Sequence, residues 1–140
     1  MATESIAAAL RVLIVEDETL IAEELRERLS RIGFSVIAAV DSAEEGIEIA
    51  TREVPDVVLM DIRLKGKKDG VEAAREIRQQ VDVPIVYLTA YSDSVTLDRV
   101  KQGEPCGYVL KPFHERELQE AIELATRRQA IEVTTKGKNH

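Results

Sequence analysis

Five short apolar segments, separated by segments with helical periodicity, constrain the fold of this chain more than any other feature of its sequence. None of the five alternates cleanly between apolar and polar residues, which is the pattern of strands covered on both faces. The segments are "VLIV" (12–15), "VIAAV" (36–40), "VVLM" (57–60), "IVYL" (85–88) and "YVL" (108–110).

Apolar residues at helical spacing follow each expected strand. The first helix ends at Gly33, and the second begins at Ser42, which fits a capping box with Glu45. The third follows Gly70, a fourth spans about 93–102, and a fifth follows "KPF". The apolar residues expected to face the sheet are, helix by helix, Ile21, Leu25, Leu29 and Ile32; Ile47 and Ala50; Val71, Ala74, Ile77 and Val81; Val95 and Val100; and Leu118, Ala121, Ile122 and Ala125.

This alternation predicts an α/β fold: a doubly wound, five-stranded parallel sheet with five helices on its two faces, joined by right-handed crossovers. Because the chain has 140 residues, we expect a single domain over 1–140. Its core spans about 10–128, with short tails at 1–9 and 129–140. In such folds the functional site forms beyond the carboxyl ends of the strands.

Composition excludes several classes of function. Asp and Glu outnumber Lys and Arg by 26 to 19, for a net charge of −7, which argues against direct nucleic-acid binding and suits a cation. No apolar run approaches the roughly 18 residues of a membrane span, and "MATESIAAAL" lacks the basic start of a signal peptide. The single cysteine fits a reducing compartment, so we expect a cytoplasmic protein.

Polar residues follow four of the five expected strands. They are Glu16 and Asp17, Asp61, Thr89, and Lys111. Each has an ordinary interpretation by itself, as a helix cap, a turn residue, a strand former or a solvated lysine. Because the carboxyl ends of parallel strands share one edge, their joint occurrence there favours a common site.

Three clustered carboxylates need positive charge. Two like charges about 4 Å apart repel by roughly 4 kcal/mol at an effective dielectric constant near 20. One lysine is insufficient to neutralise the cluster, whereas a divalent ion supplies two more charges. Oxygen ligands without a His or Cys cluster favour Mg²⁺, with Mn²⁺ as the alternative.

Four motifs, "VLIVEDE", "VVLMDIRL", "IVYLTA" and "GYVLKPF", closely resemble, in this order and spacing, the receiver domain of two-component response regulators. The resemblance runs from about Arg11 to Arg128. It implies the flavodoxin-like strand order 2-1-3-4-5. It also implies that Asp61 accepts a phosphoryl group from a histidine kinase or histidine phosphotransfer protein. Lys111 and Thr89 would contact that group, in a protein that is not otherwise an enzyme.

By the same resemblance, Mg²⁺ is held by the carboxylates of Asp17 and Asp61, by the backbone carbonyl of Arg63, by water molecules and, often through water, by Glu16. Arg63 and Tyr91 are expected to limit the access of water to the phosphoryl group, which predicts slow self-dephosphorylation.

The resemblance further implies a switch through Thr89 and Tyr108, although a half-buried strand tyrosine is the ordinary alternative for Tyr108. The switch would alter the surface of helix 4, strand 5 and helix 5, which is expected to bind a downstream protein or form a homodimer.

Two segments depart from the family's pattern. Lys65 stands where a proline is common and Gly70 comes one residue later than usual, which leaves the shape of this loop and the choice of partner open. Pro105 is atypical and is expected to stiffen the loop before the fifth strand. His114 and Cys106 are interpreted as a surface residue and a structural residue.

Rival interpretations fit the residues less well. A haloacid-dehalogenase-like phosphatase needs a second aspartate where this chain has Arg63, and a flavodoxin-like module needs a phosphate-binding loop where it has "EDETL". A receiver-like module that signals without phosphorylation typically lacks some of the residues present here. Twelve residues follow Arg128, so we expect a stand-alone receiver or the amino-terminal receiver of a larger regulator or kinase.

Overall fold

The computed structural model describes residues 10–90 and 107–138, with side chains described as far as residue 130. The expected fourth helix, at about 93–102, lies outside these ranges. The strands are β1 (Arg11–Val15), β2 (Ser35–Val40), β3 (Val57–Asp61), β4 (Ile85–Thr89) and β5 (Gly107–Leu110). The helices within the described ranges are α2 (Thr19–Ile32), α3 (Ala43–Glu53), α4 (Gly70–Gln80) and α6 (Glu115–Lys138).

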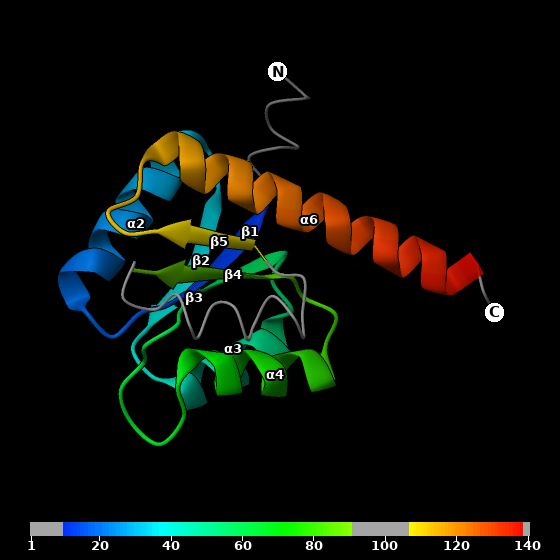
Figure 1. The fold of residues 1–140 in the computed structure, drawn as a ribbon, viewed down its shortest axis with the longest axis horizontal. Helices are drawn as coiled ribbons and strands as arrows, with labels where there is room; N and C mark the ends of the chain where they lie inside the picture. The colour runs from blue at the N-terminus through cyan, green and yellow to red at the C-terminus, as the bar shows by residue number, and fades with distance from the viewer. Residues whose placement is uncertain (1–9, 91–106, 139–140) are drawn as a thin grey trace.

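The strands form one parallel sheet in the order β2-β1-β3-β4-β5, which confirms the predicted fold (Figure 1). The strand order reverses at β1 and β3, which are neighbours and therefore border the topological switch point. Val15 at the end of β1 pairs with Met60 of β3, and Asp61 pairs with Leu88 of β4. This register brings the residues that follow β1 next to the end of β3.

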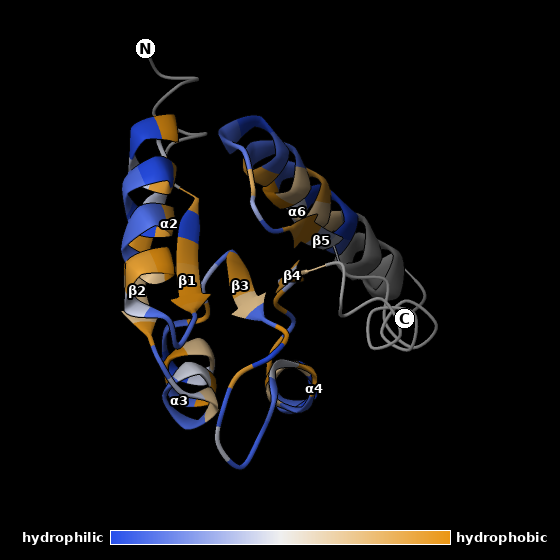
Figure 2. Cartoon of the chain, turned by 60° about the vertical axis from the view of Figure 1, so that its left-hand side comes forward, coloured by the Kyte–Doolittle hydropathy of each residue, from blue (hydrophilic) through white to orange (hydrophobic). Residues whose placement is uncertain are grey.

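Helices cover both faces of the sheet, with α2 and α6 on one side and α3 and α4 on the other (Figure 2). Successive strand residues point to opposite faces, so Leu13 of β1 packs toward α3 and α4 whereas Ile14 packs toward α2 and α6. Every residue of β3 and β4 is buried. The two covered faces explain why the strands are continuous apolar runs.

The helix ends follow their sequence signals. α2 ends at Gly33, whose φ of 118° is the left-handed conformation that glycine adopts without strain. At the start of α3, the Ser42 hydroxyl accepts a hydrogen bond from the Glu45 N–H at 3.2 Å. At the start of α4, Asp69 and Glu72 form a complete capping box, which the sequence analysis did not identify.

The carboxyl-terminal segment differs from the prediction. Residues from 129 onward were expected to form a short tail, but α6 continues to Lys138 and projects past the sheet (Figure 1). The segment holds no proline, and its one glycine, Gly137, lies in the last turn of the helix, so no strong stop signal precedes it.

Candidate functional site

Strand ends position the candidate residues at one edge of the sheet. Glu16 and Asp17 directly follow β1, Asp61 is the last residue of β3, Thr89 is the last residue of β4, and Lys111 directly follows β5. The Lys111 N–H donates a hydrogen bond of 2.7 Å to the Thr89 carbonyl, which joins the last two of these ends. The topology therefore brings Glu16, Asp17, Asp61 and Lys111 together as predicted, and it places Thr89 at the end of the strand next to Asp61.

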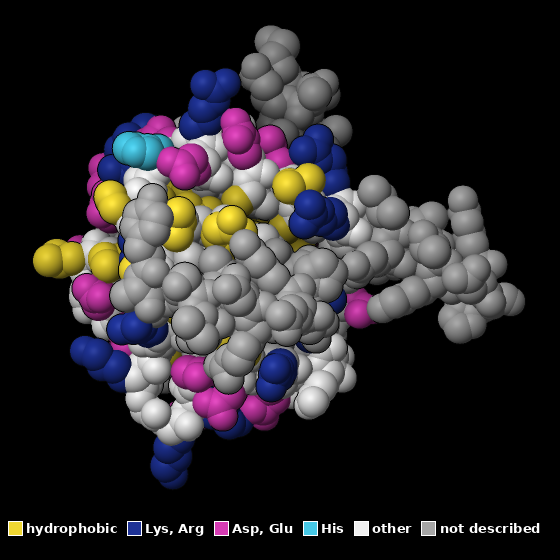
Figure 3. Space-filling view, in the orientation of Figure 1, with side chains coloured by type: hydrophobic (Ala, Val, Ile, Leu, Met, Phe, Trp, Pro, Cys, Tyr) yellow, Lys and Arg dark blue, Asp and Glu magenta, His cyan; other side chains and the backbone are white. Residues whose placement is uncertain are grey.

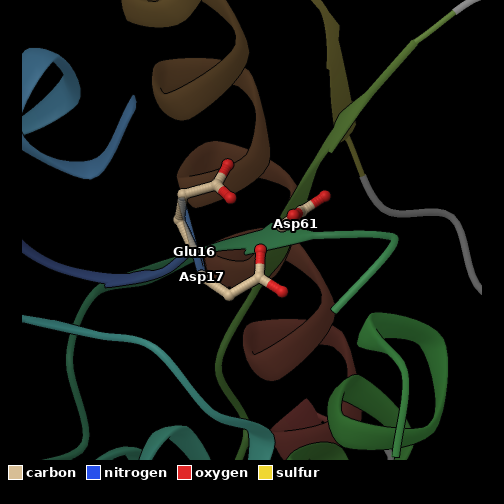
Figure 4. A group of neighbouring side chains, drawn as sticks. All are labelled: Glu16, Asp17 and Asp61. Atoms are coloured by element: carbon tan, nitrogen blue, oxygen red, sulfur yellow. The ribbon is translucent and has the colours of Figure 1, made fainter. Parts of the chain in front are cut away.

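The three carboxylates form a cluster (Figure 4). Glu16, Asp17 and Asp61 each offer one carboxylate oxygen, and these atoms all lie within 4.8 Å of one another. Glu16 is 1% exposed and Asp61 is 4% exposed. Because burial removes the water that would otherwise screen these charges, the cluster requires positive charge from elsewhere.

Lys111 supplies one such charge. Its ammonium lies 3.3 Å from Glu16 Oε1 and 3.5 Å from Asp61 Oδ1. Burial by itself lowers the pKa of Lys111, but attraction to Asp61 and Glu16 outweighs it, so that the pKa is raised above its usual value. Lys111 therefore remains positively charged at neutral pH.

Glu16 carries the clearest electrostatic perturbation of the site. Burial, followed by interaction with Asp61, raises the pKa of Glu16 from 4.5 to about 7. Its Oε2 accepts a hydrogen bond from the Glu18 N–H at 3.1 Å. Its Oε1 is buried and accepts no hydrogen bond from any residue that the structure describes, and its contact with Lys111 is an ion pair only. A buried carboxylate oxygen that accepts no hydrogen bond is suited to bind a cation.

Backbone amides of the β3–α4 loop fix the other two carboxylates. The Arg63 N–H donates a hydrogen bond of 3.1 Å to Asp61 Oδ1. The Lys65 N–H donates one of 3.0 Å to Asp17 Oδ2. The second bond depends on the departure at Lys65, because a proline at this position has no N–H to donate. The choice of partner stays a prediction.

Gly70 brings the start of α4 against the end of β3. A Cβ at this position would lie 2.1 Å from the carbonyl oxygen of Asp61 and 2.9 Å from the Cα of Ile62. The Gly70 N–H also donates a hydrogen bond of 3.2 Å to the Ile62 carbonyl. Only glycine permits this approach, which holds the backbone of Asp61 in place.

The donor set fits a divalent cation. The clustered ligand atoms are all carboxylate oxygens, which suit a hard ion such as Mg²⁺. Three carboxylates are clustered with one ammonium, and Glu16 Oε1, which accepts no hydrogen bond from any described residue, lies among them. Glu16, Asp17 and Asp61 are the residues that would hold the ion. The backbone of Arg63 is beside Asp61, whereas its carbonyl as a ligand remains a prediction.

The structure describes three of the remaining predicted residues, Thr89, Tyr108 and His114. Thr89 is 1% exposed at the end of β4, and Tyr108 of β5 is 40% exposed. His114 immediately precedes α6 and is exposed, in agreement with its interpretation as a surface residue. Tyr91 lies outside the described residues, as do Pro105 and Cys106.

Sequence analysis missed the groups that orient the carboxylates. The amides of Glu18 and Lys65 carry no side-chain signal, and the Lys65–Asp17 bond joins residues 48 positions apart. The dipeptide Asp69–Gly70 was a usable signal, since it combines a helix cap with a residue that permits close approach.

A family model described as the response regulator receiver domain matches residues 12–123. The chain is 39% identical over 118 residues to the transcriptional regulatory protein PdtaR of Mycobacterium tuberculosis, covering 84% of this chain and 57% of that protein. It is 44% identical over 121 residues to the probable transcriptional regulator ycf27 of Guillardia theta, covering 84% and 46%. The chain therefore spans about half the length of these curated relatives.

Solved structures agree with this assignment. The signal receiver domain of a modulated diguanylate cyclase from Desulfovibrio desulfuricans G20 is 38% identical, with a TM-score of 0.80 over 87% of this chain and 97% of that one. The receiver domain of the PhyR response regulator from Erythrobacter litoralis is 34% identical, with a TM-score of 0.71 over 84% and 89%.

This chain belongs to the response regulator receiver domain family, the class of two-component signalling domains. In residues 10–90 and 107–138, no helix has both the length and the apolar character needed to cross a bilayer.

Proposed function

We propose that this receiver accepts a phosphoryl group on Asp61 in a reaction that depends on Mg²⁺. The observation that carries the proposal is the cluster at the switch point, in which Asp61 is buried beside Lys111 and shares an oxygen-only cradle with Glu16 and Asp17. A carboxylate that accepts a phosphoryl group needs no general base, because it is already an anion.

In the proposed step, one carboxylate oxygen of Asp61 forms a bond to phosphorus. The bond from phosphorus to the donor, a histidine nitrogen in a protein donor, breaks, and its electron pair leaves with the donor. The Arg63 N–H and the Lys111 ammonium hold Asp61 for in-line attack. A bound divalent ion supplies the charge neutralisation that phosphoryl transfer requires.

Lys111 and Thr89 are proposed to stabilise the product. The Lys111 ammonium is 3.5 Å from Asp61 Oδ1, within reach of an oxygen of a phosphoryl group attached there. Thr89 ends the adjacent strand, where its hydroxyl would donate to another oxygen. Thr89 is 1% exposed, and the Lys111 side chain is 22% exposed, so the effective dielectric constant around these groups is below that of water and such bonds are strengthened.

The product would be an acyl phosphate, whose lifetime depends on the access of water. Arg63 and Tyr91 are the proposed barriers, and slow self-dephosphorylation is expected. Arg63→Ala and Tyr91→Ala variants should lose the phosphoryl group faster than the parent, as followed by intact mass over time. Equal rates of loss would refute this part of the proposal.

Signalling is proposed to proceed from Thr89 to Tyr108 and to the surface made by the expected fourth helix, β5 and α6. Tyr108 is 40% exposed and Leu124 of α6 is 44% exposed, so apolar area is already available there. The proposed partners are a histidine kinase or phosphotransfer protein, and either a downstream protein or a second copy of the chain. The domain would catalyse only its own phosphorylation and dephosphorylation, in the cytoplasm.

The test is incubation with Mg²⁺ and acetyl phosphate, followed by intact mass spectrometry. The parent should gain one phosphoryl group, whereas Asp61→Asn should gain none. Addition of EDTA should prevent the gain. A parent that remains unmodified would contradict the proposal and favour a receiver-like module that signals without phosphorylation.

A further inference from the structure

The β3–α4 loop, which follows the acceptor strand, is strongly basic. Its residues 63–68 read "RLKGKK", four cations in six positions, in a chain whose net charge is −7. Arg63, Lys65 and Lys67 are exposed. The loop projects beside α4 and is hydrophilic almost throughout (Figure 2), and basic side chains stand out at the corresponding edge of the surface (Figure 3).

Specific contacts hold this loop against the site. The N–H groups of Arg63 and Lys65 bind Asp61 and Asp17, as described above. At its other end, Lys68 pairs with Glu76 of α4, and Asp69 caps that helix. The loop is therefore fixed at both ends, and the backbone of Arg63 and Lys65 lies against the acidic cluster.

The apex of the loop presents cations that are available to a partner. Gly66, with a φ of 110°, makes the turn between Lys65 and Lys67. Neither lysine forms an ion pair with a residue that the structure describes, in contrast to Lys68. Lys111 is itself engaged by Glu16 and Asp61. Lys65 and Lys67 are thus exposed cations without an ion-pair partner among the described residues, and the Lys65 backbone lies against Asp17.

An anionic phosphoryl donor meets an electrostatic obstacle at this site, because the site itself is acidic. A charge of one sign beside a cleft raises the local concentration of ions of the opposite sign, and salt screens the effect over about 10 Å at 0.1 M ionic strength. Cations next to the cluster would offset its repulsion of an approaching anionic donor.

We infer that Lys65 and Lys67 attract doubly negative, small phosphoryl donors to Asp61 and so set the rate at which such donors react. The inference rests on the proposed function. With acetyl phosphate, an Asp61 oxygen bonds to phosphorus while the phosphorus–oxygen bond to the acyl group breaks and acetate leaves with the electron pair. The lysines take no part in that exchange and act on the approach alone.

The test compares a double variant, Lys65→Gln/Lys67→Gln, with the parent. The substitutions keep both backbone N–H groups, so the Lys65–Asp17 hydrogen bond is preserved. A control, Arg127→Gln/Arg128→Gln, removes the same charge from exposed positions of α6, on the other side of the sheet from α4 (Figure 1). The readout is the initial rate of phosphoryl gain by intact mass, at a constant Mg²⁺ concentration.

At low ionic strength the loop variant should react with acetyl phosphate roughly three- to tenfold more slowly than the parent, while the control variant should not differ. Phosphoramidate carries about one negative charge, so its attraction to the lysines is about half as strong. The factor by which the loop variant reacts more slowly with phosphoramidate should therefore be near the square root of the factor for acetyl phosphate. At about 1 M salt, where the screening length is roughly 3 Å, the difference should disappear.

Each outcome decides the matter. Equal rates for parent and loop variant at low salt overturn the inference alone, as does an equal slowing in the α6 control. If the parent gains no phosphoryl group from either donor, the proposed function fails and the inference fails with it.

Discussion

Leu59 lies within β3 and Glu16 directly follows β1, the neighbouring strand, and both side chains are almost entirely buried, at 0% and 1% exposure. Burial of the leucine stabilises the fold by about 2 kcal/mol. Burial of the glutamate has the opposite effect, because it raises the pKa from 4.5 to about 7, a shift equivalent to roughly 3 kcal/mol. The apolar interior of the sheet therefore stabilises the fold. The pocket at the strand ends is arranged to bind a cation, and this arrangement lowers the stability of the fold.

The largest effect is expected in the interior. Leu59→Ala should lower the free energy of unfolding by about 2–5 kcal/mol, because it leaves a cavity in the layer between the sheet and the α2 and α6 helices. Leu20→Ala is the control, since Leu20 is 81% exposed and its removal should change stability by less than about 0.5 kcal/mol. Urea unfolding measures both, and a loss near that of the control would contradict the packing described here.

The next largest effect is expected at Gly70, where the start of α4 contacts the end of β3, between the sheet interior and the pocket. Gly70→Ala should destabilise the protein by about 3 kcal/mol, because the new Cβ meets the Asp61 carbonyl at 2.1 Å. It should also slow phosphoryl uptake in the molecules that remain folded, since the acceptor strand must shift. Gly107→Ala is the matched control, because its nearest neighbour would be a Val86 methyl at 3.4 Å. Equal stability of the two variants would refute the role of Gly70.

The pocket itself should respond to pH. Glu16 has a higher pKa in the folded protein than in the unfolded chain, so the folded state holds more protons between pH 4.5 and about 7. Without divalent ions, its contribution to stability is therefore present below pH 4.5 and is lost as pH rises through 7. At pH 8, Glu16→Gln should be more stable than the parent by roughly 1–3 kcal/mol, and the advantage should vanish near pH 4.5.

The same variant separates stability from binding. Glu16→Gln should bind Mg²⁺ more weakly, which isothermal titration calorimetry measures directly. If Glu16→Gln instead loses stability relative to the parent as the pH rises from 5 to 8, the Glu16 carboxylate stabilises the ion-free fold. The contrast between the buried Leu59 and the buried Glu16 would then be wrong.

The sequence predicts the interior of the sheet more completely than it predicts the pocket at the strand ends. The five apolar runs predicted the sheet correctly, because strands covered on both faces must be apolar throughout. The strand-end positions of Asp61 and Lys111 also followed, since parallel topology alone brings them together. The extension of α6 past residue 128 was not predicted, because the absence of a strong stop signal does not by itself show that a helix continues.

The finer organisation of the pocket could not be predicted for a physical reason. The Lys65 amide that orients Asp17 depends on how the β3–α4 loop returns to β1, and every non-proline residue offers the same N–H. The perturbed pKa of Glu16 depends on burial and on Asp61, both of which require the assembled site. Lys65 was noted only as a departure, although its consequence is a hydrogen bond within the site.

The most direct test of the central claim is the free energy of unfolding at pH 8, measured by urea with 10 mM Mg²⁺ and again with EDTA. If the carboxylates form a cation cradle with a dissociation constant near 1 mM, Mg²⁺ should stabilise the parent by about 1.4 kcal/mol, and Asp17→Asn should lose most of this gain. Identical unfolding curves for the parent in the two buffers would contradict a cation site at the strand ends.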